Sequence, residues 1–276
     1  MPTWLITGCS TGLGRALAEA ALDRGDNVVA TARDAATIQA LVDSHPGTGL
    51  ALTLDVTKPE QITAAVSAAQ ERFGTIDLLV NNAGYGYRSA VEEAEDSDVQ
   101  ALFATNFFGP VGLIKTVLPG MRGQRHGAIV NISSIGARLS PPGSGYYAAS
   151  KAALEALTAS LRREVGPLGI TAMIVEPGAF RTDFYGRSLA QSRHPIDDYA
   201  DTAGRRRKEH DSSNGTQQGD PAKAAQAIVA AVESSDPPGM LVLGPDALSH
   251  FRGSLDALGA DLDAWEGVST ATSFAN

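Results

Sequence analysis

The segment SSIGARLSPPGSGYYAASK, residues 133–151, joins the end of an apolar run to the start of a predicted helix. Tyr147 and Lys151 are four residues apart, so their side chains project from the same face of that helix. A tyrosine in water titrates near ~10, but an ammonium group within a few ångströms favours the phenolate and lowers this pKa by roughly one to three units. The spacing therefore predicts a phenol that works as a general acid or base.

Ser134 adds a hydroxyl group to this pair. It follows residues 128–132, an apolar run that we interpret as a β-strand, so its side chain lies at the carboxyl edge of the predicted sheet. Ligands bind at that edge in open parallel sheets. Tyr-x-x-x-Lys alone also occurs on ordinary helices, as a solvated aromatic residue beside a surface lysine. The functional interpretation therefore depends on the other motifs of the chain.

A glycine loop lies near the N-terminus. Residues 4–7 form a short apolar run, and residues 8–14 (GCSTGLG) separate it from an Ala/Leu-rich helix at residues 15–24. A strand, a glycine loop and a helix N-terminus in this order bind phosphate, because exposed backbone N–H groups and the positive end of the helix dipole attract the anion. Glycines here also suit a plain turn, and their spacing, G-x-x-x-G-x-G, departs from the general dinucleotide fingerprint. We predict a pyrophosphate site at this loop.

Four motifs together resemble the short-chain dehydrogenase/reductase family. They are Thr-Gly-x-x-x-Gly-x-Gly at residues 7–14, Asn-Asn-Ala-Gly at residues 81–84, Tyr-x-x-x-Lys at residues 147–151 and Pro-Gly-x-x-x-Thr at residues 177–182. The resemblance covers residues 3–182 and matches the rest of the chain only in outline. The sequences around the glycine loop and after the second strand are similar to the branch that contains steroid and retinol dehydrogenases, which sets no substrate.

The resemblance implies hydride transfer between a nicotinamide cofactor and a carbonyl or secondary-alcohol substrate. In the reductive direction Tyr147 would protonate the forming alkoxide, and Ser134 would hydrogen-bond the same oxygen. Lys151 would bias the proton of Tyr147 and hold the nicotinamide ribose. Asn106 would help to hold a water molecule beside the lysine, although a buried asparagine among apolar neighbours also has a purely structural interpretation.

Arg33 indicates which cofactor is used. It stands at the end of the second predicted strand, where an acidic residue holds the ribose 2′-hydroxyl of NAD and an arginine accommodates the 2′-phosphate of NADP. NAD-using relatives carry aspartate at the position of Ala32, so NADP is favoured, while Asp34 keeps NAD open. The predicted cofactor-binding residues are Thr7, Gly8, Ser10, Thr11, Gly12, Leu13, Gly14, Arg33, Asp55, Val56, Asn82, Ala83, Gly84, Tyr147, Lys151, Pro177, Gly178, Phe180 and Thr182.

Two alternative functions would use some of the same motifs. A non-catalytic NADP-binding regulatory protein of this fold would keep the glycine loop, but it would not need Ser134, Tyr147, Lys151 and Asn106 together. A sugar-nucleotide epimerase uses the same Tyr/Lys pair. It normally requires a larger carboxyl-terminal substrate domain than the residues after Thr182 provide.

Apolar strands alternate with amphipathic helices along the chain. This pattern predicts one α/β domain over residues 1–276, a doubly wound, Rossmann-type parallel sheet of about seven strands with helices on both faces. Residues 183–219 change to a polar composition and are expected to form an irregular substrate lid. A helix at 221–233, a strand at 240–243 and a helix at 247–258 should follow, and residues 269–276 are expected to fray.

Composition argues against other classes of function. The net charge of −9 has interspersed signs, which disfavours a nucleic-acid partner, and no apolar run approaches the ~18 residues of a membrane span. Cys9 is the only cysteine, so a reducing, cytoplasmic setting fits. The five histidines lack metal-ligand spacing, so we predict no metal site; we expect them on the surface or in loops, and the basic run at residues 205–208 on a solvated face. We expect a homodimer or homotetramer.

Overall fold

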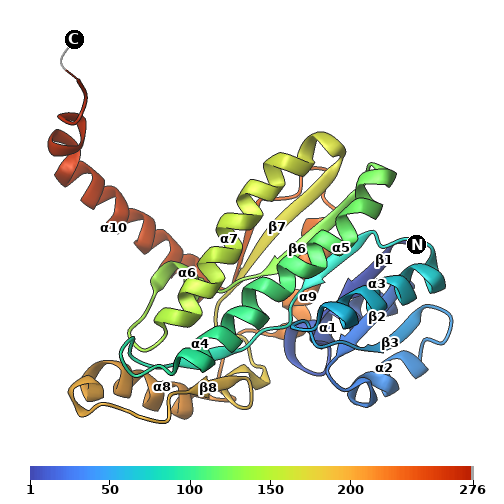
Figure 1. The fold of residues 1–276 in the computed structure, drawn as a ribbon, viewed down its shortest axis with the longest axis horizontal. Helices are drawn as coiled ribbons and strands as arrows, with labels where there is room; N and C mark the ends of the chain where they lie inside the picture. The colour runs from blue at the N-terminus through green and yellow to red at the C-terminus, as the bar shows by residue number, and fades with distance from the viewer. Residues whose placement is uncertain (275–276) are drawn as a thin grey trace.

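Seven parallel strands form the central sheet of the structure, a computed structural model that describes residues 1–274 (Figure 1). Their order from edge to edge is β3 (Gly49–Thr53), β2 (Asn27–Ala32), β1 (Thr3–Ile6), β4 (Leu78–Asn81), β6 (Gly127–Ile132), β7 (Ile170–Pro177) and β9 (Met240–Leu243). The chain winds outward in both directions from the β1/β4 pair, and this reversal leaves a crevice at the carboxyl ends of the strands. The predicted doubly wound sheet is confirmed.

Helices cover both faces of this sheet (Figure 1). One face carries α1 (Gly12–Asp23) and α9 (Pro221–Val232), and the other carries α3 (Pro59–Phe73), α5 (Gly109–Gln124) and α7 (Gly145–Val165). Successive strand residues alternate between the two cores: Ile6 belongs to the core that contains Leu17, and Leu5 to the core that contains Leu113. Burial on both faces explains why the strands read as continuous apolar runs.

Shorter elements connect this framework. The remaining helices are α2 (Gln39–Asp43), α4 (Asp96–Phe103), α6 (Ile135–Leu139), α8 (Arg205–Ser213) and α10 (Pro245–Thr270). Two strands, β5 (Gly86–Arg88) and β8 (Leu189–Gln191), form a separate parallel pair. The 3₁₀ segments are η1 (Ala35–Ile38), η3 (Gly166–Leu168), η4 (Asp183–Tyr185) and η5 (Asp197–Tyr199), and the π-helical turns are η2 (Ala104–Phe108) and η6 (Ala200–Gly204).

The π-helical turn η2 joins α4 to α5 and contains Asn106, which is fully buried. Pro110 follows it and has no N–H to donate, which fits an irregular turn at this point of the helix. By length and composition the continuous helix Asp96–Gln124 meets the requirements of a membrane span, which corrects our statement that no segment is long and apolar enough. Leu113 and Val117 of this helix pack in the core against the sheet.

The predicted lid segment, residues 183–219, is not irregular. It forms η4, β8, η5, η6 and α8, and β8 pairs with β5 beside the open end of the sheet. Arg88 on β5 contacts Asp211 on α8 at 2.7 Å and donates a second hydrogen bond to Gln191 at 3.0 Å. The polar composition misled the prediction because polar residues of this segment pair with buried partners far away in the sequence.

Two expectations for α8 are wrong for the same reason. Arg207 forms an ion pair with Glu93, whose side chain is completely buried, so this part of the basic run is not a solvated face. His210 is buried as well and is not a surface or loop histidine. Arg207 holds α8 against the segment that follows β5, and His210 stacks on Tyr185 of η4.

The C-terminal helix α10 starts at Pro245 and extends away from the body of the molecule (Figure 1). It is longer than the predicted helix at residues 247–258. Ser269 and Thr270, which we expected to fray, are its last two residues. Residues 275–276 of the predicted frayed end lie outside the described residues.

Candidate active site

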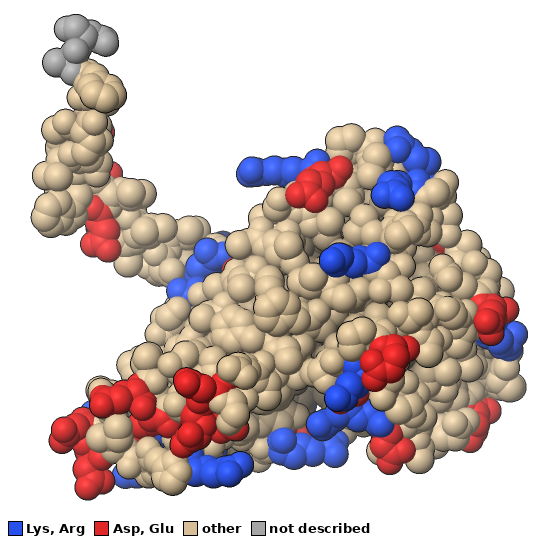
Figure 2. Space-filling model, in the orientation of Figure 1, with Lys and Arg blue, Asp and Glu red and all other residues tan. Residues whose placement is uncertain are grey.

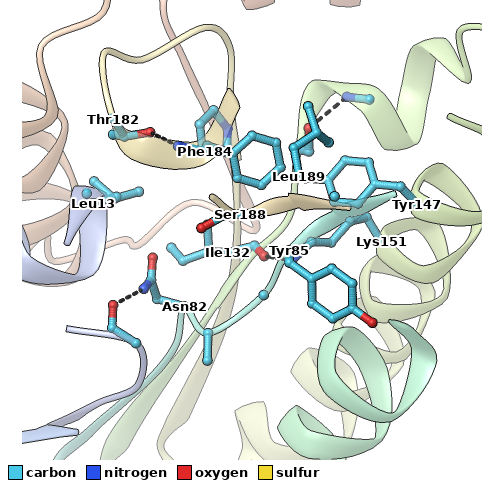
Figure 3. A pocket seen from close by; sticks show the side chains of 18 of the residues that line it. Leu13, Asn82, Tyr85, Ile132, Tyr147, Lys151, Thr182, Phe184, Ser188 and Leu189 are labelled. Carbon is cyan, nitrogen blue, oxygen red and sulfur yellow. Dashed lines mark hydrogen bonds between the residues drawn. The ribbon is translucent and has the colours of Figure 1, made fainter. Parts of the chain in front are cut away.

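A cavity of about 870 Å³ opens at the carboxyl ends of the strands, in the crevice that the doubly wound topology leaves. The glycine loop and the residues after β2 and β3 line one end, and α7 and the predicted lid segment line the other. Figure 3 shows side chains from these elements around a common space. Among the predicted catalytic and cofactor-binding residues, only Thr7, Gly14 and Asn106 do not line it.

The glycine loop packs closely against the loop after β4. Gly8 and Gly12 have φ values of 73° and 61°, in the left-handed region that favours glycine. A Cβ at Gly8 would lie 3.0 Å from Cα of Ala83, and a Cβ at Gly14 would overlap the amide nitrogen of Asn82. Gly14 therefore allows α1 to pack against the neighbouring loop, and its contribution to a ligand site is indirect.

Thr7 lies behind the cavity wall and binds the loop after β4. Its Oγ1 accepts hydrogen bonds from the backbone N–H groups of Asn82 and Ala83, each at 2.9 Å. The side-chain amide of Asn82 donates in return to the carbonyl of Thr7 at 2.8 Å. These reciprocal bonds fix the Asn-Asn-Ala-Gly loop against the glycine loop, so the two motifs form one unit.

Ser134, Tyr147 and Lys151 come together at the other end of the cavity. Ser134 follows β6 and caps α6, with Oγ accepting from the N–H of Gly136 at 3.0 Å. Tyr147 lies in the first turn of α7, and Lys151 lies one turn later beside it (Figure 3). The ammonium of Lys151 donates to the carbonyl of Ile132 at 2.8 Å. The structure thus places the three predicted side chains around one point.

The pKa of Tyr147 does not move in the predicted direction. Burial raises the pKa of Tyr147 to about 12; the hydrogen bond with Ser134 opposes this shift and Tyr185 adds to it. Burial lowers the pKa of Lys151 to about 8, against the effect of Glu155. The predicted lowering of this pKa is therefore wrong here, because burial raises it and the ammonium of Lys151 is directed at a carbonyl. Tyr147 keeps its proton at neutral pH.

Asn106 lies beside Gly84, which also borders Lys151. Its Oδ1 accepts from the N–H of Tyr85 at 3.1 Å, and its Nδ2 donates to the carbonyl of Tyr85 at 2.9 Å and to Ser150 at 3.1 Å. Gly84 leaves room for the side chains of Asn106 and Lys151, since a Cβ at Gly84 would lie 3.1 Å from Oδ1 of Asn106 and 3.2 Å from Nζ of Lys151. Asn106 therefore positions the loop that borders the cavity, and its predicted role in a water relay stays a prediction.

The far end of the cavity distinguishes Arg33 from its neighbour. Arg33 lines the cavity, whereas the carboxylate of Asp34 accepts from the N–H of Ala36 at 3.0 Å and caps η1. Asp55 lines the same end. Burial acts to raise the pKa of Asp55, but hydrogen bonds from Thr57 outweigh it and hold the pKa below its usual value. The carboxylate is therefore fixed and ionised at this end of the cavity.

The loop after β7 closes the cavity from above the glycine loop. A Cβ at Gly12 would lie 3.3 Å from Cβ of Thr182, so the two loops meet. Asp246, at the start of α10, accepts from the N–H of Ala179 at 2.8 Å and holds this loop in place. Sequence reasoning missed Asp246, because nothing local in the sequence connects α10 with a loop that lies more than 60 residues earlier.

A row of aromatic side chains starts at Tyr147, with Phe184 next to it in Figure 3. Ring centroids are 5.8 Å apart for Tyr147 and Phe184, 6.1 Å for Phe184 and Tyr185, and 4.7 Å for Tyr185 and His210, which are stacked. Burial and the nearby Arg206 lower the pKa of His210 to about 4, so its ring is neutral. Residues from the three segments 85–92, 135–146 and 183–219 line this end of the cavity.

A pair of buried carboxyl groups lies behind Ser133, which precedes the catalytic serine. Glu155 on α7 accepts from the hydroxyl of Ser133 at 2.5 Å, and Arg138 bridges Glu155 and Glu176 at 3.0 and 3.5 Å. Burial and the neighbouring Glu155 raise the pKa of Glu176 to about 7. One arginine faces two carboxyls, so the pair retains a proton well above the usual pH for a glutamic acid.

This proton makes stability depend on pH. A raised pKa in the folded state gives stabilisation that is full below the ordinary value of 4.5 and is lost as the pH rises to about 7. We expect the melting temperature to fall between pH 5 and pH 8, and Glu176→Gln to flatten this dependence. Melting curves across this range would measure it, with the exposed Glu164→Gln as the matched control. An unchanged slope in Glu176→Gln would contradict the assignment.

Comparison with known proteins identifies the family. A family profile described as short chain dehydrogenase matches residues 2–192. Oxidoreductase BOA17 of Botryotinia fuckeliana is 37% identical over 270 residues, 98% of each chain. A short-chain dehydrogenase from Streptomyces avermitilis has 43% identity and a TM-score of 0.92 over 99% of this chain and 100% of that one. A short-chain dehydrogenase/reductase from Burkholderia phymatum, solved in complex with NAD, has 25% identity and a TM-score of 0.80 over 91% and 92%. The glycine loop, the arrangement of Ser134, Tyr147 and Lys151, and the comparisons all agree. The chain belongs to the short-chain dehydrogenase/reductase family of oxidoreductases.

Proposed function

We propose that the protein transfers a hydride between NADP(H) and a carbonyl or secondary-alcohol substrate. The observation that carries the proposal is the single cavity in which Ser134, Tyr147 and Lys151 lie at one end and the glycine loop at the other. The left-handed Gly8 and Gly12 and the adjoining N-terminus of α1 fit a pyrophosphate between these ends. The residues present therefore suit a dinucleotide that reaches from Arg33 to Tyr147.

A bound nicotinamide would supply the hydride, and the protein would supply the proton and the orientation. Tyr147 is protonated at neutral pH, which suits donation of a proton to the oxygen of a carbonyl as it gains negative charge. Ser134 adds a second hydrogen bond to the same oxygen. Lys151, whose pKa is lowered to about 8, sits one helical turn away with its ammonium on the carbonyl of Ile132, and it would hold the nicotinamide ribose.

Arg33 supports NADP as the cofactor. Its side chain lines the end of the cavity where the adenosine ribose would lie, and a guanidinium group suits a phosphate. Asp34 does not line the cavity, and its carboxylate caps η1 by accepting from the N–H of Ala36. It is therefore poorly placed to bind the ribose hydroxyls of NAD. The NAD bound to the Burkholderia relative shows that the family also includes NAD users.

The substrate end favours an apolar or aromatic carbonyl compound. Phe184, Tyr185 and Leu189 line it, and the buried His210 beyond them is neutral. The direct test mixes the protein with NADPH or NADH and a panel of ketones and aldehydes and follows absorbance at the nicotinamide band. Turnover with NADPH is expected. A regulatory protein would bind NADPH without turnover with any member of the panel.

The segment at residues 183–219 is proposed to act as a lid that tightens on ligands. It borders the cavity through Phe184 and Tyr185 and begins directly after Thr182. We expect trypsin to cut at Arg187, Arg193 and Arg205 more slowly when NADP and a substrate analogue are present. The time course of the fragments, read by mass spectrometry, measures this. Equal rates with and without ligands would show a permanently ordered segment.

The proposed working form is a homodimer or homotetramer in a reducing compartment such as the cytoplasm. Support for self-association comes from α10, where large apolar side chains are exposed over most of its length. Support for the compartment comes from Cys9, which is buried and has its pKa raised to about 12 by burial, so it is an inert thiol that needs no disulfide partner.

A further inference from the structure

The outer part of α10 has no covering element among residues 1–274. The helix leaves the body beside α6, where the guanidinium of Arg138 lies 5.2 Å from the ring centroid of Phe251 (Figure 1). Beyond that point the positions of Gly253, Gly259 and Gly267 face open space, with nothing within 4 Å of an added Cβ. Glycine is a poor helix former, and a helix of this length gains most of its stability from packing. The segment therefore needs a partner.

The apolar side chains of α10 form one continuous stripe. They recur at alternating spacings of three and four residues, which is the a/d pattern of a two-helix contact, and they are Leu248, Phe251, Leu255, Leu258, Leu262 and Trp265. The four outermost are more than half exposed: Leu255 at 51%, Leu258 at 57%, Leu262 at 66% and Trp265 at 64%. A helical stripe of this kind on an isolated arm is typical of a helix that packs against another helix.

The charges on α10 are distributed unevenly along it. Its basic groups, His250 and Arg252, lie near the body, and the stretch from Gly253 to Thr270 has acidic residues but no lysine or arginine. Figure 2 shows this arm with red patches and blue only near its base. Two parallel copies would place every acidic residue beside its own copy, whereas an antiparallel pair can bring the outermost one, Glu266, beside Arg252 of the other copy.

We propose that α10 pairs with α10 of a second copy of this chain, as an antiparallel two-helix contact centred near Ala260. This inference rests on the proposed self-association and not on the proposed catalysis. With the axis at Ala260, Leu258 of each copy meets Leu262 of the other, and Leu255 meets Trp265. On one flank Arg252 faces Glu266 of the second copy.

The centre of the contact is suited to a close crossing. Gly259 and Ala260 are small, so the two backbones can approach each other there. Asp261 is the unfavourable group nearest the axis, where it meets its own copy, and Asp256 and Asp263 add like charges on either side of it. The contact is short and lies at the low end of specific interfaces in area, so association is expected to depend on protein concentration.

Sedimentation velocity or light scattering of the full chain over a concentration series measures the mass of the assembly and so tests the α10 pair. The parent chain is expected to reach the dimer mass or a multiple of it, and Leu258→Asp/Leu262→Asp to halve that mass. The matched control, Ala257→Asp/Ala264→Asp, adds the same two charges to the outer face of the helix and should keep the parent mass. Asp261→Asn should associate at least as tightly. Melting curves and NADPH binding establish that each variant is folded.

A monomeric parent chain at every concentration would overturn both the self-association and the helix pair. Association retained by Leu258→Asp/Leu262→Asp would overturn the helix pair alone and locate the contact elsewhere. Neither result bears on catalysis, which the turnover assay measures separately. This separation keeps the two proposals distinguishable.

Engineered cysteines test the direction of the pair. The native Cys9 is buried and does not compete. In the antiparallel register a mixture of differently tagged Leu255→Cys and Trp265→Cys chains should form a disulfide between unlike chains, and neither variant alone should cross-link. Cross-linking within each single variant instead would indicate a parallel pair and overturn the proposed register.

Discussion

Replacement of Tyr147 by phenylalanine is expected to lower turnover by at least ~10²-fold, with NADP(H) binding almost unchanged. The lost hydroxyl is the proton donor, so its removal affects the transition state rather than the cofactor. The phenylalanine ring retains the contact with Phe184, whose centroid lies 5.8 Å away, so the row of aromatic side chains should persist. Steady-state kinetics with NADPH and fluorescence titration of the cofactor would separate the two quantities.

The adjacent tyrosine provides the matched control. Tyr146 donates its hydroxyl hydrogen to the carbonyl of Val91 at 3.1 Å and does not line the cavity. Tyr146→Phe removes the same atom from the next residue of the same helix and should leave turnover close to the parent value. Comparable turnover in Tyr147→Phe and the parent protein would refute the assignment of the acid.

The parts of this structure that the sequence predicts well are those in which contiguous residues carry the constraint. The strands are buried on both faces, so each reads as an unbroken apolar run. Gly14 is identifiable because any side chain there would overlap Asn82. Tyr147 and Lys151 are four residues apart in the sequence, which predicts directly that they lie one helical turn apart. In each case the determining contact is local or belongs to a motif with fixed spacing.

The parts that failed depend on partners far along the chain. Arg207 looks like a solvated cation until Glu93 is placed beside it, 114 residues away in the sequence. The carboxyls of Glu155 and Glu176 share one arginine only because the middle of α7 and the end of β7 lie beside Arg138 of α6. The prediction for the pKa of Tyr147 was wrong for a related reason. The four-residue spacing predicts that Lys151 is near, but it does not reveal that the ammonium binds the carbonyl of Ile132. Nor does it reveal the burial of Tyr147, which opposes ionisation.

Arg33→Ala is expected to weaken NADPH binding by roughly ten- to a hundredfold, or about 1.5–3 kcal/mol, the range for a hydrogen bond between charged groups. NADH binding should change little, because NADH has no 2′-phosphate for the guanidinium to contact. Arg33 lines the cavity and is exposed, so its removal leaves no buried partner unsatisfied and should not alter the fold. Titration of each cofactor by fluorescence, at one fixed salt concentration, measures the two affinities.

The comparison between cofactors decides the role of Arg33, because a general loss of positive charge would affect both dinucleotides through their shared pyrophosphate. Lys58 is the matched control: it is exposed, acts on Asp55 as Arg33 does, and does not line the cavity. Lys58→Ala should weaken both cofactors slightly and equally. If Arg33→Ala behaved in the same way, Arg33 would contribute only to the general field, and the choice of NADP would have to come from another residue at this end of the cavity. A loss confined to NADPH would place the guanidinium at the 2′-phosphate, since this is the group by which the two cofactors differ.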